Sequence, residues 1–194
     1  SDYQATYIFP KPVSITDNDT TSTSVSLEGT LGDDTITFAT SATEHVVTIN
    51  GNVTTYNPGE VDTIHIDSLS GNDQITITGT DERDEATLGP NSVDVLGSGY
   101  AIYGVNVETI VVDGGAGTDD EATLTGSDNS NRLYSYAEYS RLFDSPRTFS
   151  HRVDGFEVLT INSAGGGRDY AYLYDSSEND VLDATPDGVQ LNRQ

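Results

Sequence analysis

The chain of 194 residues contains no cysteine, no methionine and no tryptophan, and it has only eight basic residues. The lack of cysteine leaves the redox compartment open, because cytosolic and surface proteins both allow it. No apolar stretch approaches the ~20 residues of a membrane-spanning helix, so membrane insertion is not expected. The sequence has no signal peptide and does not begin with methionine, which favours a processed or excised piece of a longer protein.

The charge of the chain is strongly one-sided. Its 32 acidic residues outnumber the basic ones and give a formal net charge of -24, and Lys11 is the only lysine. This balance argues against nucleic acid and anionic membrane surfaces as partners and favours cations. Strong acidity with few aromatics is also typical of disorder. The regular burial pattern described next opposes disorder.

Pairs of apolar residues, separated by one residue, recur along the chain at a nearly fixed interval. The first pairs of the four repeats are Val13 and Ile15, Ile64 and Ile66, Ile110 and Val112, and Leu159 and Ile161. Taking the residue two before each pair, the repeats begin at Lys11, Asp62, Glu108 and Glu157, in steps of 51, 46 and 49 residues. A repeat of this length indicates a stacked architecture, because a single unit buries too little apolar surface by itself.

Within a repeat the apolar residues alternate with Thr, Asp, Glu and Ser, which is the pattern of short strands with one buried face. We therefore predict an all-β fold, a right-handed parallel β-solenoid (β-helix or β-roll) of about four repeats of 46–51 residues with hairpin-like excursions. The solenoid is expected to span residues 21–194. The alignment predicts two core columns, one of Ile15, Ile66, Val112 and Ile161, and one of Ile77, Leu124 and Leu173.

A longer excursion follows the third strand of each complete repeat, at residues 46–56, 93–103 and 141–151. Asn50-Gly51 in the first excursion is a strong signal for a two-residue hairpin. The excursions are either hairpins or extra half-rungs. A repeat is then either one rung plus a hairpin or two rungs of about 23 residues each.

Glycine-rich and aspartate-rich turns separate the strands, and one of them has a family resemblance. In GGAGTDDEATL, Gly114, Gly115, Gly117 and Asp119 resemble the nonapeptide G-G-x-G-x-D-x-apolar-x of the repeats-in-toxin family, with the apolar residue one position late. Residues 29–36, 68–75 and 164–169 match in part. The resemblance implies a calcium-binding repeat of a large bacterial exoprotein, in which stacked turns each supply part of an ion site.

Calcium prefers six to eight oxygen ligands, and glycine lets the backbone turn its carbonyls toward an ion. The candidate metal ligands are Asp17, Asp19, Asp33, Asp34, Asp67, Asp73, Asp113, Asp119, Asp120 and Asp169. Unlike the tandem nonapeptides of the family, the good matches here lie almost 50 residues apart. The alternative is that glycine and aspartate only make the tight corners of the solenoid.

Residues 1–20 allow two interpretations. Their ending, VSITDNDT, resembles the last strand of a Calx-beta domain, so this segment is either the end of a preceding Calx-beta-like domain or an N-terminal rung. Val13 and Ile15 also fit the solenoid register, which supports the second interpretation.

Three tyrosines near the C-terminus form a further candidate site. Tyr170, Tyr172 and Tyr174 alternate with Ala171 and Leu173, so they are expected to form an outward row on one strand. Such a row binds carbohydrate or a partner protein, or it shields the sheet through cross-strand pairs.

The remaining chemistry-bearing residues carry weaker signals. The histidines share no metal-ligand spacing, and His45, His65 and His151 are expected at the surface. Arg83, Arg132 and Arg168 lie in turns beside acidic residues. They are expected to be charge partners of these residues; the alternative is that one of them is the base of a polysaccharide lyase. GxSxG, HExxH and phosphate-loop motifs are absent.

These observations favour a non-catalytic, calcium-stabilised structural or adhesive repeat module of a large secreted or cell-surface bacterial protein. The expected partners are calcium ions and neighbouring domains, copies of the same protein or glycans. A carbohydrate- or protein-binding adhesin module that uses the tyrosine row is the first alternative. A lyase-like β-helix enzyme is the second, and the scarcity of basic residues makes an anionic substrate awkward for it.

Overall fold

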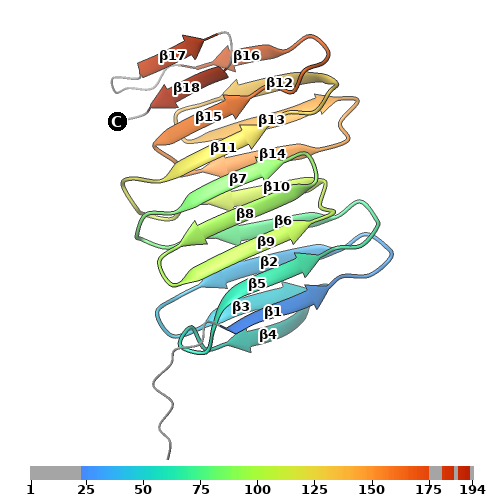
Figure 1. The fold of residues 1–194 in the computed structure, drawn as a ribbon, viewed down its shortest axis with the longest axis vertical. Helices are drawn as coiled ribbons and strands as arrows, with labels where there is room; N and C mark the ends of the chain where they lie inside the picture. Colours follow the sequence, from blue (N-terminus) through green and yellow to red (C-terminus); the bar gives the residue numbers. More distant parts are fainter. Residues whose placement is uncertain (1–22, 175–180, 186–187, 193–194) are drawn as a thin grey trace, which may run out of the picture.

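The computed structural model describes residues 23–174, 181–185 and 188–192, which form two facing sheets of nine strands each and no helix (Figure 1). Sheet A contains β1 (Thr23–Glu28), β5 (Val61–Asp67), β7 (Glu85–Gly89), β8 (Ser92–Gly97), β9 (Tyr100–Val105), β11 (Glu121–Thr125), β15 (Val158–Asn162), β17 (Val181–Thr185) and β18 (Gly188–Asn192). Sheet B contains β2 (Thr35–Thr40), β3 (His45–Ile49), β4 (Asn52–Tyr56), β6 (Gln74–Thr78), β10 (Thr109–Asp113), β12 (Ser130–Ser135), β13 (Tyr139–Ser145), β14 (Ser150–Asp154) and β16 (Tyr170–Leu173).

The period-two pattern of the sequence determines which face of each strand is buried. In β6, Ile75 and Ile77 are fully buried, whereas Gln74 and Thr78 face solvent. The inward residues of the two sheets form one continuous apolar core along the molecule. Each fully buried Ile or Leu stabilises the fold by roughly 1.5 to 3 kcal/mol. The predicted all-β solenoid is confirmed.

Each excursion is a hairpin that turns the chain back along the sheet. After the crossings from β5 to β6 and from β6 to β7, β8 and β9 return antiparallel through sheet A until β9 pairs with β5. The same happens in sheet B with β12, β13 and β14, where β14 pairs with β10. In the first excursion, Asn50 and Gly51 both have positive φ, as a two-residue hairpin turn requires. The half-rung alternative is therefore wrong.

Consecutive repeats exchange the two sheets. Four of the five strands from β5 to β9 lie in sheet A, whereas four of the five from β10 to β14 lie in sheet B. A repeat is thus three crossing strands plus a hairpin, and it is not two rungs of equal length.

This exchange makes the two predicted core columns wrong. Ile66 and Val112 hold equivalent places in successive repeats, yet they lie in β5 and β10, in opposite sheets. The same exchange separates Val112 from Ile161, and Leu124 from Ile77 and Leu173; Ile15 lies outside the described residues. The columns instead join different strands of successive repeats, and in one of them Phe38, Ile77 and Val112 are cross-strand neighbours with Val153 next.

Residues 1–20, predicted as a Calx-beta-like end or an N-terminal rung, lie outside the described residues. Across the part of the chain that the structure describes, no helix is long and apolar enough to span a membrane.

Candidate functional site

The turns that connect the two sheets stack on one another at the edges of the molecule. Backbone hydrogen bonds hold these stacks together, such as Gly79 N–H to the Asp113 carbonyl at 2.8 Å and Gly126 N–H to the Asn162 carbonyl at 2.9 Å. Three stacks form, from residues 29–34, 68–73 and 106–108, from residues 79–84, 114–120 and 155–157, and from residues 126–131 and 163–169. The acidic residues singled out in the sequence lie in or beside these stacks.

Within the first stack, each turn ends on an acidic residue, and the carboxylates of the second and third turns accept the backbone N–H of the residue that ends the turn before. The Asp34 N–H donates to Asp73 Oδ1 at 2.7 Å, and the Asp73 N–H donates to Glu108 Oε2 at 2.8 Å. We call such a series a carboxylate ladder. It satisfies backbone donors at the start of β2 and β6 that would otherwise be buried without a partner.

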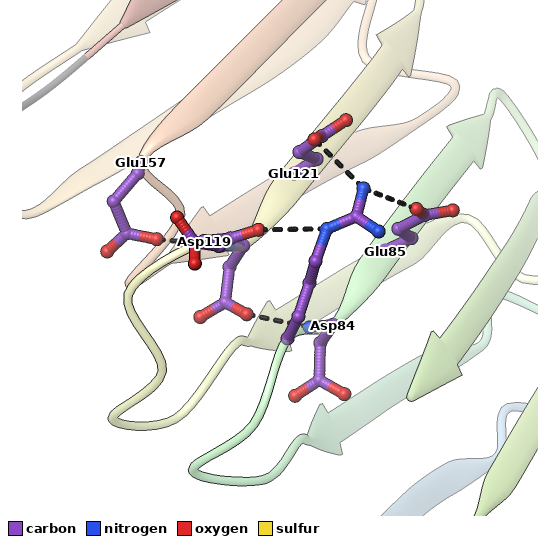
Figure 2. Close-up of polar contacts among 7 residues, drawn as sticks. Asp84, Glu85, Asp119, Glu121 and Glu157 are labelled. Carbon is purple, nitrogen blue, oxygen red and sulfur yellow. Dashed lines mark hydrogen bonds and ion pairs between the residues drawn. The ribbon is translucent and has the colours of Figure 1, made fainter. Parts of the chain in front are cut away.

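The other two stacks repeat this arrangement. The Asp84 N–H donates to Asp120 Oδ1 at 2.7 Å, and the Asp120 N–H donates to Glu157 Oε2 at 2.8 Å (Figure 2). In the third ladder the Asn131 N–H donates to Asp169 Oδ1 at 2.8 Å. Charge-assisted hydrogen bonds of this kind are about twice as strong as neutral ones. The carboxylate ladders therefore join turns that lie far apart in the sequence.

The first residue of each carboxylate ladder also closes its own turn. The Thr30 N–H donates to Asp34 Oδ2 at 2.7 Å, and the Thr80 N–H donates to Asp84 Oδ2 at 2.7 Å. The Thr30 N–H is the main cause that lowers the pKa of Asp34. The sequence carries a signal for this closure of the turn. Each such turn begins with Gly-Thr or Gly-Ser, at 29–30, 79–80 and 126–127, and ends at Asp34, Asp84 or Asn131.

Sequence reasoning missed several members of these ladders. Glu108 and Glu157 accept backbone N–H groups, and both were marked only as the start of a repeat. Tyr100 was also missed, although its hydroxyl donates to Asp84 Oδ1 at 2.8 Å in the interior. Burial raises the pKa of Tyr100 far above its ordinary value, with the Asp84 charge as a second cause. The recurrent acidic residue before each first strand is the signal that points to the two glutamates.

The middle residue of the second ladder has an unusual carboxyl group. Asp120 is fully buried, and burial raises its pKa to about 6, with the nearby charges of Glu157, Asp84 and Asp119 as further causes. Only Oδ1 accepts a hydrogen bond, and Oδ2 is buried without a partner. Asp73, the middle residue of the first ladder, also has a buried Oδ2 without a partner.

The other predicted metal ligands lie around the turns but do not converge. Asp33 accepts the Asn72 N–H at 2.9 Å, and Asp113 accepts the Gly115 N–H at 3.0 Å. Asp67 accepts from Leu69 N–H and Asn106 Nδ2, which lowers its pKa, mainly through Asn106. Asp119 and Asp169 are exposed, and Asp17 and Asp19 lie outside the described residues. Among the residues that the structure describes, no three acidic or histidine side chains are placed to hold one metal ion.

Arg83 has the predicted role of a charge partner. Its guanidinium contacts Glu85 Oε1 at 2.5 Å and Glu121 Oε1 at 2.9 Å, and it donates to the Asp119 carbonyl at 3.2 Å (Figure 2). Asp119 lies in the second stack of turns, and Glu85 and Glu121 lie on β7 and β11, the strands that follow two of its turns. For Arg132 and Arg168, both exposed, no ion pair is found within the described part of the chain.

The histidine prediction is right for one residue and wrong for two. His65 is exposed and stacks on Tyr103, with ring centroids 5.0 Å apart. His45 and His151 are buried, because each occupies an inward position of its strand, where it packs against Phe38 or Phe149. Burial lowers the pKa of His151 to about 4, so this imidazole is neutral at pH 7.

The predicted outward row is present. The exposed fraction of the surface is 42% for Tyr170, 42% for Tyr172 and 48% for Tyr174. Two of the rings stack on tyrosines on or directly after β12, with centroids 4.8 Å apart for Tyr172 and Tyr134 and 4.5 Å apart for Tyr174 and Tyr136. One face of each of these two rings is therefore covered, which leaves less aromatic surface for stacking on a sugar.

A cleft of about 590 Å³ opens where the turns of the first two hairpins meet. It is lined by hydroxyl and acidic side chains, among them Thr40, Ser41, Asp81 and Glu82, together with His45. No arginine or lysine is among the described residues that line the cleft.

No protein family, curated protein or solved structure matches this chain. Any functional conclusion therefore rests on the residues and geometry of the chain itself.

Proposed function

We propose that the chain is a non-catalytic structural module, an acidic solenoid that serves as a spacer in a large secreted or cell-surface bacterial protein. The carboxylate ladders carry the proposal. Asp34, Asp73, Asp84 and Asp120 are buried and accept hydrogen bonds from backbone or side-chain groups of the stacked turns. Acidic side chains used in this way maintain the fold and are not available to a substrate.

The disposition of the basic residues supports a non-catalytic role. A lyase acting on an acidic polysaccharide needs a basic group that faces carboxylates in an open groove. Of the three candidate bases, Arg83 is engaged by Glu85 and Glu121, whereas Arg132 and Arg168 are exposed and not among the lining residues of the cleft. The cleft beside His45 is lined by acidic and hydroxyl groups instead. A spacer function fits this arrangement better than turnover of an anionic chain.

Calcium stabilisation is the second candidate, and one observation favours it. The buried Oδ2 atoms of Asp73 and Asp120 lack hydrogen-bond partners, and an unpaired buried carboxylate oxygen costs free energy that a cation would offset. Against it, calcium needs six to eight oxygens. In both Asp73 and Asp120, Oδ1 already accepts a backbone N–H. The described turns therefore fit calcium poorly without rearrangement, and calcium binding stays a prediction.

Thermal unfolding followed by circular dichroism decides between these candidates. It is measured in EDTA, in millimolar calcium and in millimolar magnesium. A purely structural module keeps one melting temperature in all three. A calcium-stabilised module shows a rise with calcium alone, and the rise is lost in Asp73→Asn and Asp120→Asn but kept in Asp81→Asn, an exposed turn residue outside the ladders.

An adhesin role is tested on the tyrosine row. Glycan-array binding that is abolished by Tyr172→Ala and kept by Tyr103→Ala, in which an outward tyrosine of sheet A is removed, would favour adhesion over a passive spacer. Absence of any glycan-dependent signal supports the spacer.

A further inference from the structure

The outer face of sheet B carries two stacks of aromatic rings that run across three strands. In the first stack, Phe143 of β13 packs on Tyr134 of β12 at 5.8 Å, and Tyr134 packs on Tyr172 beyond it at 4.8 Å. In the second, Tyr139 packs on Tyr136 at 4.8 Å and Tyr136 on Tyr174 at 4.5 Å. Both stacks end at the edge strand β16 or directly after it.

An arginine covers the other end of each stack. The Arg147 guanidinium lies 4.7 Å from the ring centre of Phe143, and that of Arg152 lies 4.3 Å from the ring centre of Tyr139. Cation–π contacts of this kind are favourable. Among the described residues, the ring of Tyr172 also stacks on Tyr170 of the same strand, with centroids 6.5 Å apart, and Tyr174 has no ring neighbour besides Tyr136. Within the described chain, each stack thus has an arginine at one end and no ring from a further strand at the other.

The apolar side chains of β16 are exposed as well. Leu173 is 37% exposed, and Ala171 is exposed, although both alternate with the outward tyrosines and so point toward the core side. In the described chain β16 pairs only with β12. An edge strand with exposed aromatic and apolar side chains is a template for another strand.

Among the described strands, β12 alone bonds the backbone of β16, so the groups on the far side of β16 have no partner strand there. The Tyr174 N–H donates to the Ser135 carbonyl of β12 at 2.8 Å. Because N–H and C=O groups alternate between the two sides of a strand, Ala171 and Leu173 direct theirs to the free edge.

We propose that β16 pairs antiparallel with β16 of a second copy of this chain, about a two-fold axis at Tyr172. The sequence Tyr170-Ala171-Tyr172-Leu173-Tyr174 is self-complementary about its centre. Tyr172 then faces its own counterpart, Tyr170 faces the second copy's Tyr174, and Ala171 faces the second copy's Leu173. Two-fold interfaces are the commonest in oligomers because one patch serves both partners.

The register satisfies the backbone as well as the side chains. Ala171 and the second copy's Leu173 exchange both N–H···O bonds, and the symmetric pair does the same. Tyr172 lies between them in a non-hydrogen-bonded position, where opposite side chains are closest. The first aromatic stack meets its counterpart through Tyr172, and the second meets the second copy's Tyr170 through Tyr174. The edge strand of sheet A, β17, lies at the same end of the molecule (Figure 1).

Charge sets the conditions for this association. Two chains of formal charge -24 repel one another, so the dimer fraction at a given concentration rises as salt screens the repulsion. Locally the repulsion is weaker, because four of the eight basic residues lie on or beside β12–β14, namely Arg132, Arg141, Arg147 and Arg152. An acidic partner attracted by these arginines would instead bind more weakly as salt rises.

Cysteine cross-linking tests the register directly, because the chain has no cysteine of its own. Tyr172→Cys places two thiols opposite each other across the axis, within the Cα separation that a disulfide needs. Mild oxidation is expected to convert most of this variant to a disulfide dimer. Tyr174→Cys faces Tyr170 of the second copy and is expected to cross-link at least fivefold less. Equal cross-linking of the two variants would overturn the proposed register.

Sedimentation of the uncross-linked protein tests the association itself. The wild type is expected to be dimeric at tens of micromolar in 0.5 M salt. Ala171→Pro removes an N–H that points away from β12 and pairs with no described strand, so we expect a monomer with an unchanged circular dichroism spectrum. Tyr103→Asp, on sheet A, should remain dimeric. A wild type that is monomeric at every concentration and salt overturns the proposal, as does an unaltered dimer of Ala171→Pro.

Discussion

Asp34 and Asp120 are both buried carboxylates in acidic turns, yet their pKa values move in opposite directions. Asp34 accepts from the Thr30 N–H, the Thr30 hydroxyl and Asn50, and these bonds lower its pKa in spite of burial. Asp120 accepts one N–H from Asp84, so burial dominates and its pKa rises to about 6. The number of donors facing a carboxylate, rather than burial alone, decides the sign.

The raised pKa of Asp120 predicts a stability penalty at neutral pH. The unfolded pKa is near 3.9, so between about pH 4 and pH 6 the folded state holds a proton that the unfolded state has released. The contribution of Asp120 to the free energy of unfolding is therefore greatest below pH 4 and is lost as pH rises through 6. Asp120→Asn keeps an oxygen for the Asp84 N–H and is expected to increase the free energy of unfolding at pH 7 by roughly 1 to 2 kcal/mol. Urea unfolding at pH 7 and pH 4.5 measures the difference.

The comparison must be made against the wild type at each pH, because His151 has the opposite effect. Its lowered pKa gives stability above the unfolded value near 6.5, and that stability is lost as pH falls toward 4. His151 is unchanged in the variant, so its contribution cancels. Asp67→Asn is the control, because the pKa of Asp67 is lowered and its loss should destabilise at pH 7. Equal stability of Asp120→Asn and wild type at pH 7 would refute the predicted penalty.

At the scale of the element, the turns are structural units because they contact one another as closely as the strands do. Gly115 has φ of +88°, and a Cβ there would lie 2.1 Å from the Thr80 carbonyl oxygen. Only glycine allows the turn at 114–120 to rest on the turn at 79–84. The glycine of the motif is therefore explained by stacking, whether or not an ion binds.

This stacking predicts unequal effects for two glycines of matching turns. Gly115→Ala is expected to reduce the free energy of unfolding by roughly 2 to 4 kcal/mol, through both the positive φ and the clash with Thr80. Gly165→Ala, with no atom within 4 Å of its added Cβ, is expected to change it by less than about 0.5 kcal/mol. Urea denaturation of both variants measures the contrast. Similar losses in the two would show that the turns do not rely on this contact.

At the scale of the whole molecule, an apolar core and a highly charged surface oppose each other. The core is continuous through both sheets, and the formal charge of -24 acts against the compact state. Ladder bonds such as Asp84 to Asp120 and ion pairs such as Arg83 to Glu121 offset only a few of these charges.

Unspecific screening is therefore expected to stabilise the fold. Raising NaCl from about 10 mM to about 0.5 M shortens the Debye length from ~30 Å to a few ångströms, and we expect the melting temperature to rise by several degrees. Circular dichroism measures it, and sodium sulfate at matched ionic strength separates screening from anion-specific effects. A melting temperature that falls with NaCl would show that ion pairs outweigh the repulsion.

Local chemistry explains which features were predictable from the sequence. The alternation of Ile75 and Ile77 with Thr gives a strand with one buried face in any fold, and Asn50-Gly51 gives a hairpin turn. The outward direction of Tyr170 and Tyr172 follows from the same alternation. These features depend on neighbours within a few residues, so the sequence alone determines them.

The sheet that each strand joins depends on the whole chain. The hairpins return the chain along one sheet and so move the next repeat to the other, which separates Ile66 from Val112. The partner of Asp120 is likewise decided by stacking, because Glu157 lies 37 residues away along the chain. Composition and spacing place acidic residues at the corners. Only the tertiary structure determines that they face backbone N–H groups, because that depends on which turns are stacked.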